Sequence, residues 1–409
     1  MKNVLVVGGG PAGMMAAAAA AEAGCLVTLI EKNKTLGKKL LITGKGRCNV
    51  TNNCSPDELI ANLPINGRFL YSAVNRFSPS DTMDFFDGLG LKLKTERGNR
   101  VFPESDHSAD VLGALKRYLH NSGVNVVYHS VTGILTDETG AQGVKTDSGD
   151  IHADAVIIAT GGLSYPLTGS TGDGYDFAGK LGHTIVKPKP SLVPIETAEE
   201  WPKQISGLAL KNIAVRVTDK NKGKTVYEDF GELLFTHFGV SGPVVLSMSS
   251  HIRNMEPDRY TLHIDLKPAL SEKQLDARLL REFDAQKNKN LSNVMPKLLP
   301  SSLADIFLNL FGIEGEMKVN EVTKEIRQRI ISSLKDLPLN LSAFRPIDEA
   351  IVTSGGVKTS EINPATMESK LVPRLYFAGE IIDVDGYTGG FNLQIAFSTG
   401  RLAGQSASR

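Results

Sequence analysis

The stretch that decides the fold is NVLVVGGGPAGMMAAAAAAEAG, residues 3–24, followed closely by LVTLIE, residues 26–31. The first apolar run predicts a strand, GGGPAG predicts a tight turn, and the small residues after Pro11 predict a helix that stops at Gly24. The second apolar run predicts another strand, which ends at Glu31. A strand, a turn, a helix, a strand and an acid in this order are typical of a dinucleotide-binding unit.

Each residue type in this unit has a physical task. Gly8 permits the tight turn, Gly10 lets the backbone approach a pyrophosphate, and Gly13 allows close packing of the helix. The N-terminus of the helix favours the negative charge of a phosphate. Glu31 is placed to accept hydrogen bonds from ribose hydroxyls, and its charge disfavours a 2′-phosphate. The sequence therefore predicts a dinucleotide site, with a glycine turn that binds nothing as the alternative.

Composition limits the remaining classes of protein. The chain has 409 residues, of which 41% are hydrophobic, and this length favours roughly two to three domains. Its 45 Lys and Arg balance 45 Asp and Glu, so no overall field attracts nucleic acid or a membrane, although a local patch remains open. Its apolar runs are shorter than a membrane span, and its 3 cysteines lack metal-type spacing. We expect a cytoplasmic protein without a metal site or disulfides.

Two further stretches bear on which dinucleotide binds. No second GxGxxG lies between a strand and a helix, which argues against a separate nicotinamide domain. DAVIIATGG, residues 154–162, and RLYFAGEIIDVDGYTGGFNLQIAFSTG, residues 374–400, are both strand-to-loop signals. The latter predicts a strand over 375–378, a glycine-rich loop and a helix over about 392–404. The helix N-terminus suits the part of a flavin where negative charge develops, and Glu380 suits ribitol hydroxyls. An ordinary strand-to-helix connection is the alternative.

These stretches identify a resemblance. Together with KLLITGKGRCNVTN (39–52), FTHFGVSGP (235–243), VTSGGV (352–357) and TMESK (366–370), they resemble the BaiN/RdsA family of FAD-dependent oxidoreductases, also described as YhiN-like or aminoacetone oxidase-like flavoproteins. The resemblance implies an α/β fold: a Rossmann-like FAD-binding domain of the two-dinucleotide-binding flavoprotein type, with an inserted β-barrel domain and a small helical domain. The expected boundaries are 1–190 and 356–409, then 191–268 and 337–355, then 269–336.

The hydrophobic pattern agrees with this organisation. NIAVRV (212–217), GELLFT (231–236) and YTLHIDLK (260–267) alternate as strands do. From Ser271 the period changes to that of helices, because SEKQ is a capping box and two apolar stripes follow, Leu275, Leu279, Phe283 and Val322, Ile326, Ile330. We interpret these stripes as core. KPKPSLVP, residues 187–194, is interpreted as the crossing into the barrel.

The polar loop ITGKGRCNVTN, residues 42–52, has two interpretations. It is a solvated basic face, or it passes beside the flavin, where its glycines offer backbone N–H groups and its cations stabilise an anionic reduced flavin. The resemblance favours the second. A redox role for Cys48 is the alternative to an inert, buried thiol.

The resemblance, with the glycine motifs, implies a set of FAD contacts. These are Gly8, Gly10, Pro11, Ala12, Gly13, Glu31, Lys32, Lys39, Thr43, Gly44, Gly46, Arg47, Cys48, Asn49, Val131, Thr160, Gly161, Gly379, Glu380, Asp385, Gly389, Gly390, Asn392 and Leu393.

The reaction needs a residue that moves a proton while flavin N5 transfers hydride. The catalytic candidates are His237, Tyr387 and Arg47, with Tyr165 as a further one. We expect an NAD(P)H-driven reductase of a conjugated C=C bond, with FAD as the resident cofactor and NADH or NADPH as the transient reductant. The expected substrate is a small enone such as a 3-oxo-Δ4 steroid or a bile acid intermediate.

Three alternatives stay open. One is dihydrouridine synthesis on ribosomal RNA, for which Lys32, Lys34, Lys38, Lys39 and Lys45 offer a local basic patch. Another is a flavin oxidase of small amines such as aminoacetone, which produces hydrogen peroxide. The last is a flavin-binding module without enzymatic activity. No membrane partner is expected.

Overall fold

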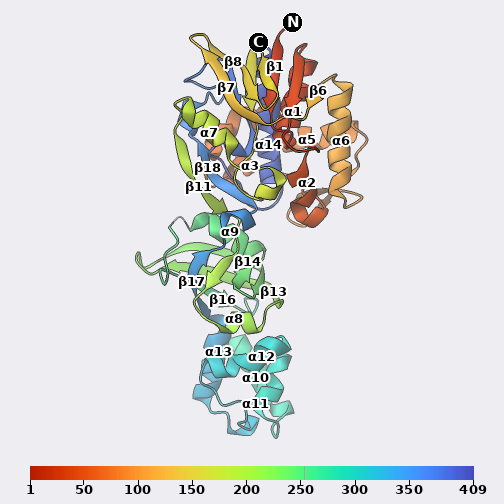
Figure 1. The fold of residues 1–409 in the computed structure, drawn as a ribbon. Coiled ribbons are helices and arrows are strands. Elements are labelled where there is room, and N and C mark those ends of the chain that lie inside the picture. The colour runs from red at the N-terminus through yellow and green to blue at the C-terminus, as the bar shows by residue number, and fades with distance from the viewer. Residues whose placement is uncertain (253) are drawn as a thin grey trace. The chain divides into compact units, whose positions relative to one another are not determined.

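The computed structural model describes residues 1–252 and 254–409, which divide into two compact units (Figure 1). Unit 1 comprises Met1–Ser191 and Pro346–Arg409, and unit 2 comprises Leu192–Arg345. Both chain ends lie in unit 1, where the red and blue ends of the colour scale meet (Figure 1). Unit 2 is therefore an insertion into unit 1. Within the described ranges, no helix combines the length and the apolar character needed to cross a membrane.

The core of unit 1 is a parallel sheet, as the sequence predicts. Its strand order is β19-β10-β1-β2-β6, and every neighbouring pair is parallel. The first helix, α1 (Pro11–Glu22), joins β1 to β2. Parallel sheets are buried on both faces, which explains why their strands are continuous apolar runs. The strands are β1 (Asn3–Val7), β2 (Leu26–Ile30), β6 (Asn125–Val127), β10 (Ala155–Ile158) and β19 (Leu375–Phe377).

The small residues of α1 allow a close helix pair. The last helix, α14 (Phe391–Ala407), packs along α1 and extends the helix predicted over 392–404 at both ends. A Cβ atom at Gly400 would lie 2.3 Å from the carbonyl oxygen of Ala12, and one at Gly404 would lie 2.2 Å from that of Ala16. The two backbones are therefore in direct contact, so the chain's first and last helices form one layer beside the sheet.

The segment expected to cross into the barrel, residues 187–194, contains the boundary between the two units, which lies between Ser191 and Leu192. Strand β11 (Ile185–Ser191) pairs antiparallel with β18 (Val352–Val357), with an irregularity between Val186 and Lys189. The ribbon has only two strands, so each has an open edge where prolines are tolerated. The assignment of residues 346–355 to the barrel was wrong for this reason, because β18 finds its partner in unit 1.

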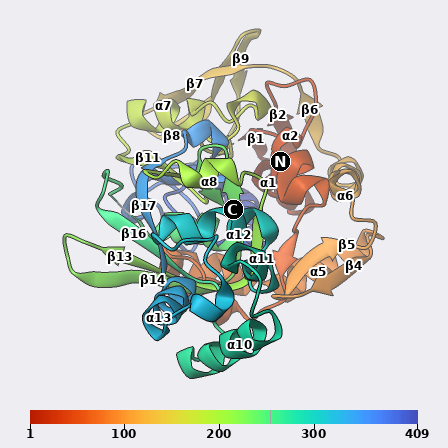
Figure 2. The same cartoon turned by 90° about the horizontal axis from the view of Figure 1, so that it is seen from below.

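The other elements of unit 1 surround the sheet. Two small antiparallel sheets have the orders β3-β5-β4 and β7-β8-β9, and Figure 2 shows β4 and β5 beside α5. Their strands are β3 (Thr51–Asn52), β4 (Leu93–Glu96), β5 (Arg100–Pro103), β7 (Val131–Asp137), β8 (Gly140–Thr146) and β9 (Gly149–His152). The helices are α2 (Lys38–Ile42), α3 (Pro56–Ala61), α4 (Tyr71–Arg76), α5 (Pro79–Gly88), α6 (Ser108–Asn121) and α7 (Asp173–Lys180).

Unit 2 contains a closed barrel of order β12-β15-β14-β13-β16-β17. The predicted alternation is confirmed, since Val215, Val217, Leu262 and Ile264 are buried at every second position of their strands. The strands are β12 (Ile195–Thr197), β13 (Ala209–Asp219), β14 (Lys224–Thr236), β15 (Gly239–Ser241), β16 (Tyr260–Asp265) and β17 (Leu337–Phe344).

The helices of unit 2 follow the predicted change of period. Ser271 forms the capping box of α10, and the stripe Leu275, Leu279 and Phe283 is buried. Ile330 is buried too, whereas Val322 precedes its helix and is only partly buried. The helices are α8 (Trp201–Gln204), α9 (Pro243–His251), α10 (Glu272–Ala285), α11 (Leu291–Val294), α12 (Ser301–Leu310) and α13 (Lys324–Lys335).

Candidate functional site

The glycines of the N-terminal turn are of two kinds, according to whether a Cβ atom would meet the protein's own backbone. A Cβ atom at Gly13 would lie 1.8 Å from the carbonyl oxygen of Gly8, and one at Gly8 would lie 2.6 Å from that of Ala159. Gly8 also has φ +105°, which favours glycine. At Gly10, which caps α1 without a side-chain acceptor, no atom lies within 4 Å of the same position. Gly8 and Gly13 thus serve the protein's own packing, and Gly10 leaves open space at the N-terminus of the helix.

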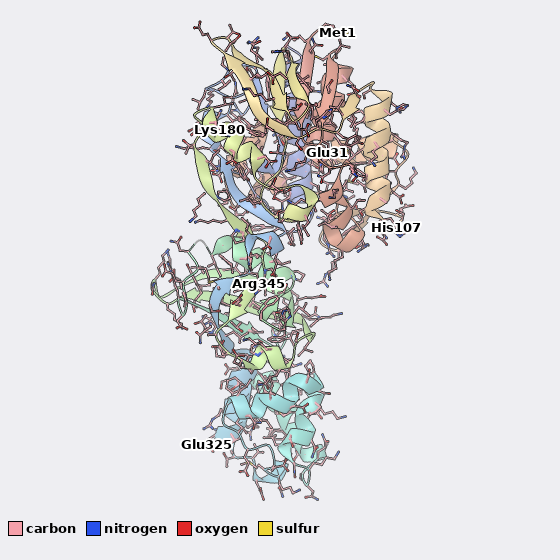
Figure 3. The ribbon with its side chains drawn as sticks, in the orientation of Figure 1. Met1, Glu31, His107, Lys180, Glu325 and Arg345 are labelled. Carbon is pink, nitrogen blue, oxygen red and sulfur yellow. The ribbon has the colours of Figure 1, made fainter. Side chains whose placement is uncertain are left out.

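Glu31 closes the turn from the end of β2. The residue is 8% exposed and lies within unit 1 (Figure 3). One carboxylate oxygen accepts the N–H of Gly9 at 2.7 Å, and the other accepts the backbone and side-chain amides of Asn33 at 2.8 and 2.7 Å. A carboxylate has about four acceptor sites, so Glu31 retains capacity for ribose hydroxyls beside Gly10.

A second polar cluster forms around Glu380. Lys39 Nζ donates to Glu380 Oε2 at 2.7 Å and to Ser164 Oγ at 2.5 Å. Glu380 Oε1 accepts the backbone N–H of Thr353 at 2.8 Å and the hydroxyl of Ser164 at 3.1 Å. The charge of Lys39 is therefore balanced within unit 1. The sequence did not predict the part of Ser164 and Thr353, which lie far from Glu380 in the chain.

The loop before α14 presents glycine backbone. Gly389 and Gly390 have φ +129° and +98°, and Gly390 caps the helix without a side-chain acceptor. A Cβ atom at Gly390 would lie 2.3 Å from the backbone of Thr51, and the amide of Asn52 donates to the carbonyl oxygen of Gly389 at 2.9 Å. The end of the polar loop 42–52 thus supports this glycine pair. Sequence reasoning missed Thr51 and Asn52, although both lie in the quoted motif.

The side chain of Asn392 folds back onto the same loop. Its Oδ1 accepts the N–H of Gly386 at 2.9 Å, and its Nδ2 donates to the carbonyl oxygens of Gly386 and Tyr387 at 2.8 and 3.3 Å. Tyr387 is half-buried, and burial followed by the charge of Asp385 raises its pKa. Leu393 is partly buried against the core. Asn392 therefore shapes the loop, and Tyr387 stays protonated at neutral pH.

The polar loop itself doubles back on left-handed backbone. After α2 comes a short helical turn, η1 (Thr43–Gly46), in which Gly44 and Lys45 have φ +57° and +58°. Gly46 and Cys48 follow with φ +86° and +61°, and the N–H of Cys48 donates to the carbonyl oxygen of Thr43 at 3.1 Å. The glycines are needed here because four residues in a short stretch adopt a conformation that side chains disfavour.

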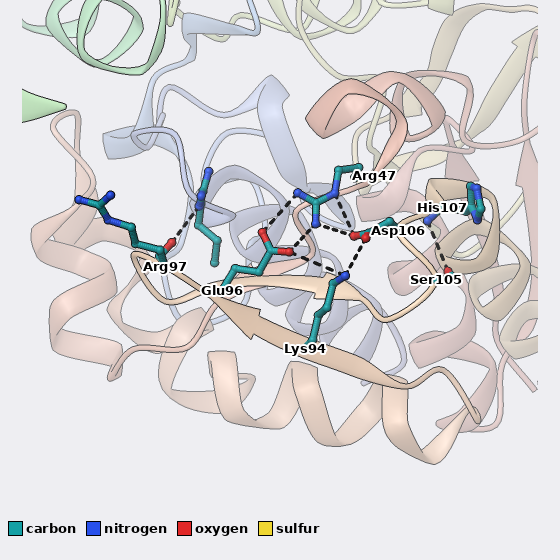
Figure 4. Close-up of polar contacts among 8 residues, drawn as sticks. Arg47, Lys94, Glu96, Arg97, Ser105, Asp106 and His107 are labelled. Atoms are coloured by element: carbon teal, nitrogen blue, oxygen red, sulfur yellow. Dashed lines mark hydrogen bonds and ion pairs between the residues drawn. The ribbon is translucent and has the colours of Figure 1, made fainter. Parts of the chain in front are cut away.

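Arg47 is held by carboxylates rather than left free (Figure 4). Its guanidinium contacts Glu96 Oε1 and Asp106 Oδ1, both at 2.5 Å, and its Cζ lies 4.2 Å from the ring centre of Phe102. Lys94 and Arg47 hold the pKa of the Asp106 carboxyl below its usual range, and Arg47 does the same for Glu96. The structure therefore anchors this loop to the β4–β5 hairpin through Arg47, while its contact with FAD or substrate stays a prediction.

Cys48 and Cys54 have the character of inert thiols. Cys48 is fully buried, and burial raises its pKa to about 12, with the hydroxyl of Thr43 opposing the shift. Burial also raises the pKa of Cys54, to about 11. Both are free cysteines. Because the thiolate is the reactive form, these values favour the inert interpretation over a redox role.

At two positions expected to contact FAD, one side-chain oxygen is buried without a protein hydrogen-bond partner. Among the residues that the structure describes, Thr160 Oγ1 and Asn49 Oδ1 are buried without a hydrogen-bond partner. Buried polar atoms are normally satisfied, so each indicates a missing ligand group or water. With Gly10, Glu31 and the Gly389–Gly390 pair, they fit a dinucleotide carrying a polar ring system.

The remaining predicted residues are less directly placed. Lys32 contacts Asp173 at 2.6 Å and the hydroxyl of Thr171, and Val131 begins β7. His237 is exposed at the turn between β14 and β15 of unit 2, with the ring of Phe238 at 4.9 Å. Gly161 and Gly379 have φ +77° at loops that follow β10 and β19. The catalytic role of His237 stays a prediction.

Comparison with known proteins adds independent findings. Residues 2–406 match the family model described as HI0933-like protein Rossmann domain. The chain is 30% identical to the 3-dehydro-bile acid Δ(4,6)-reductase of Clostridium scindens, over 100% of this chain and 99% of that protein. It is 32% identical to the ribosomal RNA dihydrouridine synthase of Escherichia coli, over 97% and 96%. Among solved structures, the 3-ketosteroid Δ4-(5α)-dehydrogenase of Rhodococcus jostii shares the fold, with a TM-score of 0.56, 15% identity and coverage of 100% and 97%.

Proposed function

Because the chain belongs to the BaiN/RdsA family of FAD-dependent oxidoreductases, we propose that it reduces a conjugated carbon–carbon double bond at the expense of NADH or NADPH. The substrate class that we propose is an enone, such as a 3-oxo-Δ4 steroid or a bile acid intermediate. The observation that carries this proposal is the end-to-end similarity to a protein named as a bile acid reductase, together with a glycine-rich site that fits FAD.

The residues of unit 1 divide the binding of FAD among them. FAD, when bound, supplies the two-electron chemistry that saturates a C=C bond. The N-terminus of α1 and Gly10 would hold the pyrophosphate, and Glu31 the adenosine ribose. Thr160 and Asn49 would donate or accept hydrogen bonds with the polar ring system and its ribitol chain.

Proton delivery falls to a side chain of this chain. Tyr387 is half-buried in the glycine loop and its raised pKa keeps the phenol protonated at neutral pH, as a general acid requires. Arg47 is engaged with two carboxylates, and a guanidinium does not release its proton in a protein. We therefore assign the proton donor to Tyr387, with His237 as the alternative from unit 2.

An anaerobic titration tests the proposal. NADH and then NADPH are added to the FAD-loaded protein, and flavin absorbance is followed. We expect bleaching, and then recovery when a 3-oxo-Δ4 steroid is added. The variant Tyr387→Phe should slow only the recovery, by about 100-fold, because it lacks the phenol that protonates the enone. Bleaching should be unchanged, because the flavin still accepts hydride from NADH or NADPH. Bleaching without recovery by any enone would refute the substrate class. Bleaching by aminoacetone, followed by peroxide formation when oxygen is admitted, would indicate the oxidase.

Ribosomal RNA is the second candidate substrate, favoured by the similarity to a dihydrouridine synthase. Uridine contains a C=C bond conjugated to a carbonyl group, so the chemistry is shared. The expected basic patch is reduced in the structure, because Lys32 pairs with Asp173 and Lys39 pairs with Glu380. Lys34 and Lys45 remain exposed.

RNA as acceptor is tested on the same reduced flavin. Recovery with uridine-containing RNA but not with steroid would establish this second function. Its affinity should then fall steeply with salt, and Lys34→Ala/Lys45→Ala should reduce that salt dependence by about two phosphate contacts.

A further inference from the structure

Asp385 is a buried carboxylic acid between two strands. The residue is 1% exposed. Its Oδ2 accepts the hydroxyl of Ser191 at 2.7 Å, and its Oδ1 accepts the hydroxyl of Ser354 at 3.0 Å. Ser191 ends β11 and Ser354 lies in β18, so the two donors come from the two strands of one antiparallel ribbon. The carboxyl group therefore bridges this ribbon to the segment that leads into the glycine loop.

The backbone on either side of Asp385 is held just as closely. Asp385 forms an isolated β-bridge with Ile65, and the N–H of Asp383 donates to the carbonyl oxygen of Val357 at 3.0 Å. A Cβ atom at Gly356 would lie 2.4 Å from the carbonyl oxygen of Ile381. The segment 381–385 thus packs directly on β18, and the glycine pair that caps α14 begins four residues later.

We propose that Asp385 is a positioning residue for the flavin site: its carboxyl group, bridged by Ser191 and Ser354, fixes the loop 386–390 in the conformation that binds FAD. The resemblance counts Asp385 among direct FAD contacts. The geometry gives its side chain a different task, because both oxygens face serine hydroxyls of the ribbon. The inference rests on the flavin site and on no particular electron acceptor.

The charge state of Asp385 should then affect how well the loop is held. Burial raises its pKa to about 6, the two serine hydrogen bonds oppose the shift, and the charges of Asp383 and Glu380 add to it. Asp383 accepts the amide of Asn66 at 2.9 Å, and Glu380 pairs with Lys39. The neutral acid holds the loop without repulsion from these neighbours, whereas ionisation introduces a third negative charge. FAD affinity should therefore fall as the pH rises through 6.

The test measures FAD affinity of the full-length protein, stripped of flavin, by fluorescence titration between pH 5 and 8. Asp385→Asn keeps the shape and a neutral hydrogen-bonding group. We expect its affinity to be independent of pH and about three- to tenfold tighter than the wild type at pH 8. Ser191→Ala/Ser354→Ala removes both donors and should bind FAD about tenfold more weakly at every pH. Asp150→Asn, an exposed aspartate on β9, should behave as the wild type.

Two results would overturn the inference. One is an Asp385→Asn variant that keeps the pH dependence of the wild type. The other is a double serine variant that binds FAD within about twofold of the wild type. If the double variant does not fold, as judged by circular dichroism, Ser354→Ala replaces it with the same expected direction. Since flavin affinity is measured without substrate, failure here leaves the reductase proposal to its own titration.

Discussion

Two glycine-bearing segments of unit 1, the turn at residues 8–13 and the polar loop at 42–52, obey different rules. In the turn, the glycines contact backbone atoms, either a few residues away, as between Gly13 and Gly8, or at the end of the neighbouring strand, as between Gly8 and Ala159. In and beside the loop, the charged side chains are held by partners far along the chain. Arg47 contacts Glu96 and Asp106, and Lys39 contacts Glu380. The comparison teaches that spacing predicts backbone geometry, whereas the task of a charged side chain depends on tertiary partners.

The largest effect is expected from a test of the claim that spacing predicts backbone geometry. The test adds a methyl group at either of two glycines of the turn. Gly13→Ala should destabilise the fold by about 4 kcal/mol or more, because its Cβ atom would meet a carbonyl oxygen at 1.8 Å. Gly10→Ala should keep stability within about 0.5–1 kcal/mol and still weaken FAD binding at least about tenfold, since its methyl occupies space left for the pyrophosphate.

Urea unfolding of the flavin-free variants and FAD titration measure the two effects separately. The comparison breaks if Gly13→Ala unfolds at the same urea concentration as Gly10→Ala. It also breaks if Gly10→Ala binds FAD as tightly as the wild type, because Gly10 would then leave no room that a ligand uses.

The buried acid Asp385 tests the claim that the task of a charged side chain depends on tertiary partners. Its protonation state depends on two strands, β11 and β18, that are distant from it in sequence. Its pKa is raised from 3.8 to about 6, so the fold favours the neutral form. The stability contributed by this preference is full below pH 3.8 and is lost as the pH rises through 6. A shift of roughly two pKa units corresponds to about 3 kcal/mol. The free energy of unfolding of Asp385→Asn should therefore exceed that of the wild type by about 3 kcal/mol at pH 8 and equal it at pH 3.5.

The measurement is urea unfolding of the flavin-free protein at both pH values. An equal difference between variant and wild type at the two pH values would mean that ionisation of Asp385 does not act on stability. Asp150→Asn on the exposed strand β9 provides the control for loss of a charge alone.

The sequence predicts most of the fold and less of the site, for physical reasons visible in single residues. Strands β1 and β2 with α1 form where periodicity and glycine spacing place them, because their signals are local. Residues 352–355 of β18 were assigned to the wrong unit, since VTSGGV does not reveal that its partner is β11. Ser164 and Thr353 converge on Glu380 from separate segments, and no spacing in the chain brings such residues together before the fold is known.

A smaller effect is expected from a variant of Arg47, which distinguishes a structural role of this side chain from a role in the reaction. Arg47→Met should lower the midpoint of thermal unfolding by a few degrees, because the guanidinium bridges two carboxylates and covers Phe102. The rate of flavin reduction by NAD(P)H should stay within about threefold of the wild type. Glu96→Gln/Asp106→Asn removes the same contacts from the other side and should reproduce both results. A loss of about 100-fold in flavin reduction in Arg47→Met alone would instead place Arg47 in the reaction.

The smallest effect concerns Cys48, whose position in the polar loop invites a redox role. With a pKa of about 12, roughly one thiol in ten thousand is ionised at pH 8, and the side chain is fully buried. Iodoacetamide should therefore leave Cys48 unmodified and flavin reduction unchanged, while the partly exposed Cys25 provides the internal control for the reagent. Peptide mass spectrometry reads both sites in one sample. Alkylation of Cys48 with parallel loss of flavin reduction would show that the loop opens in solution and that its thiol lies on the path of electrons.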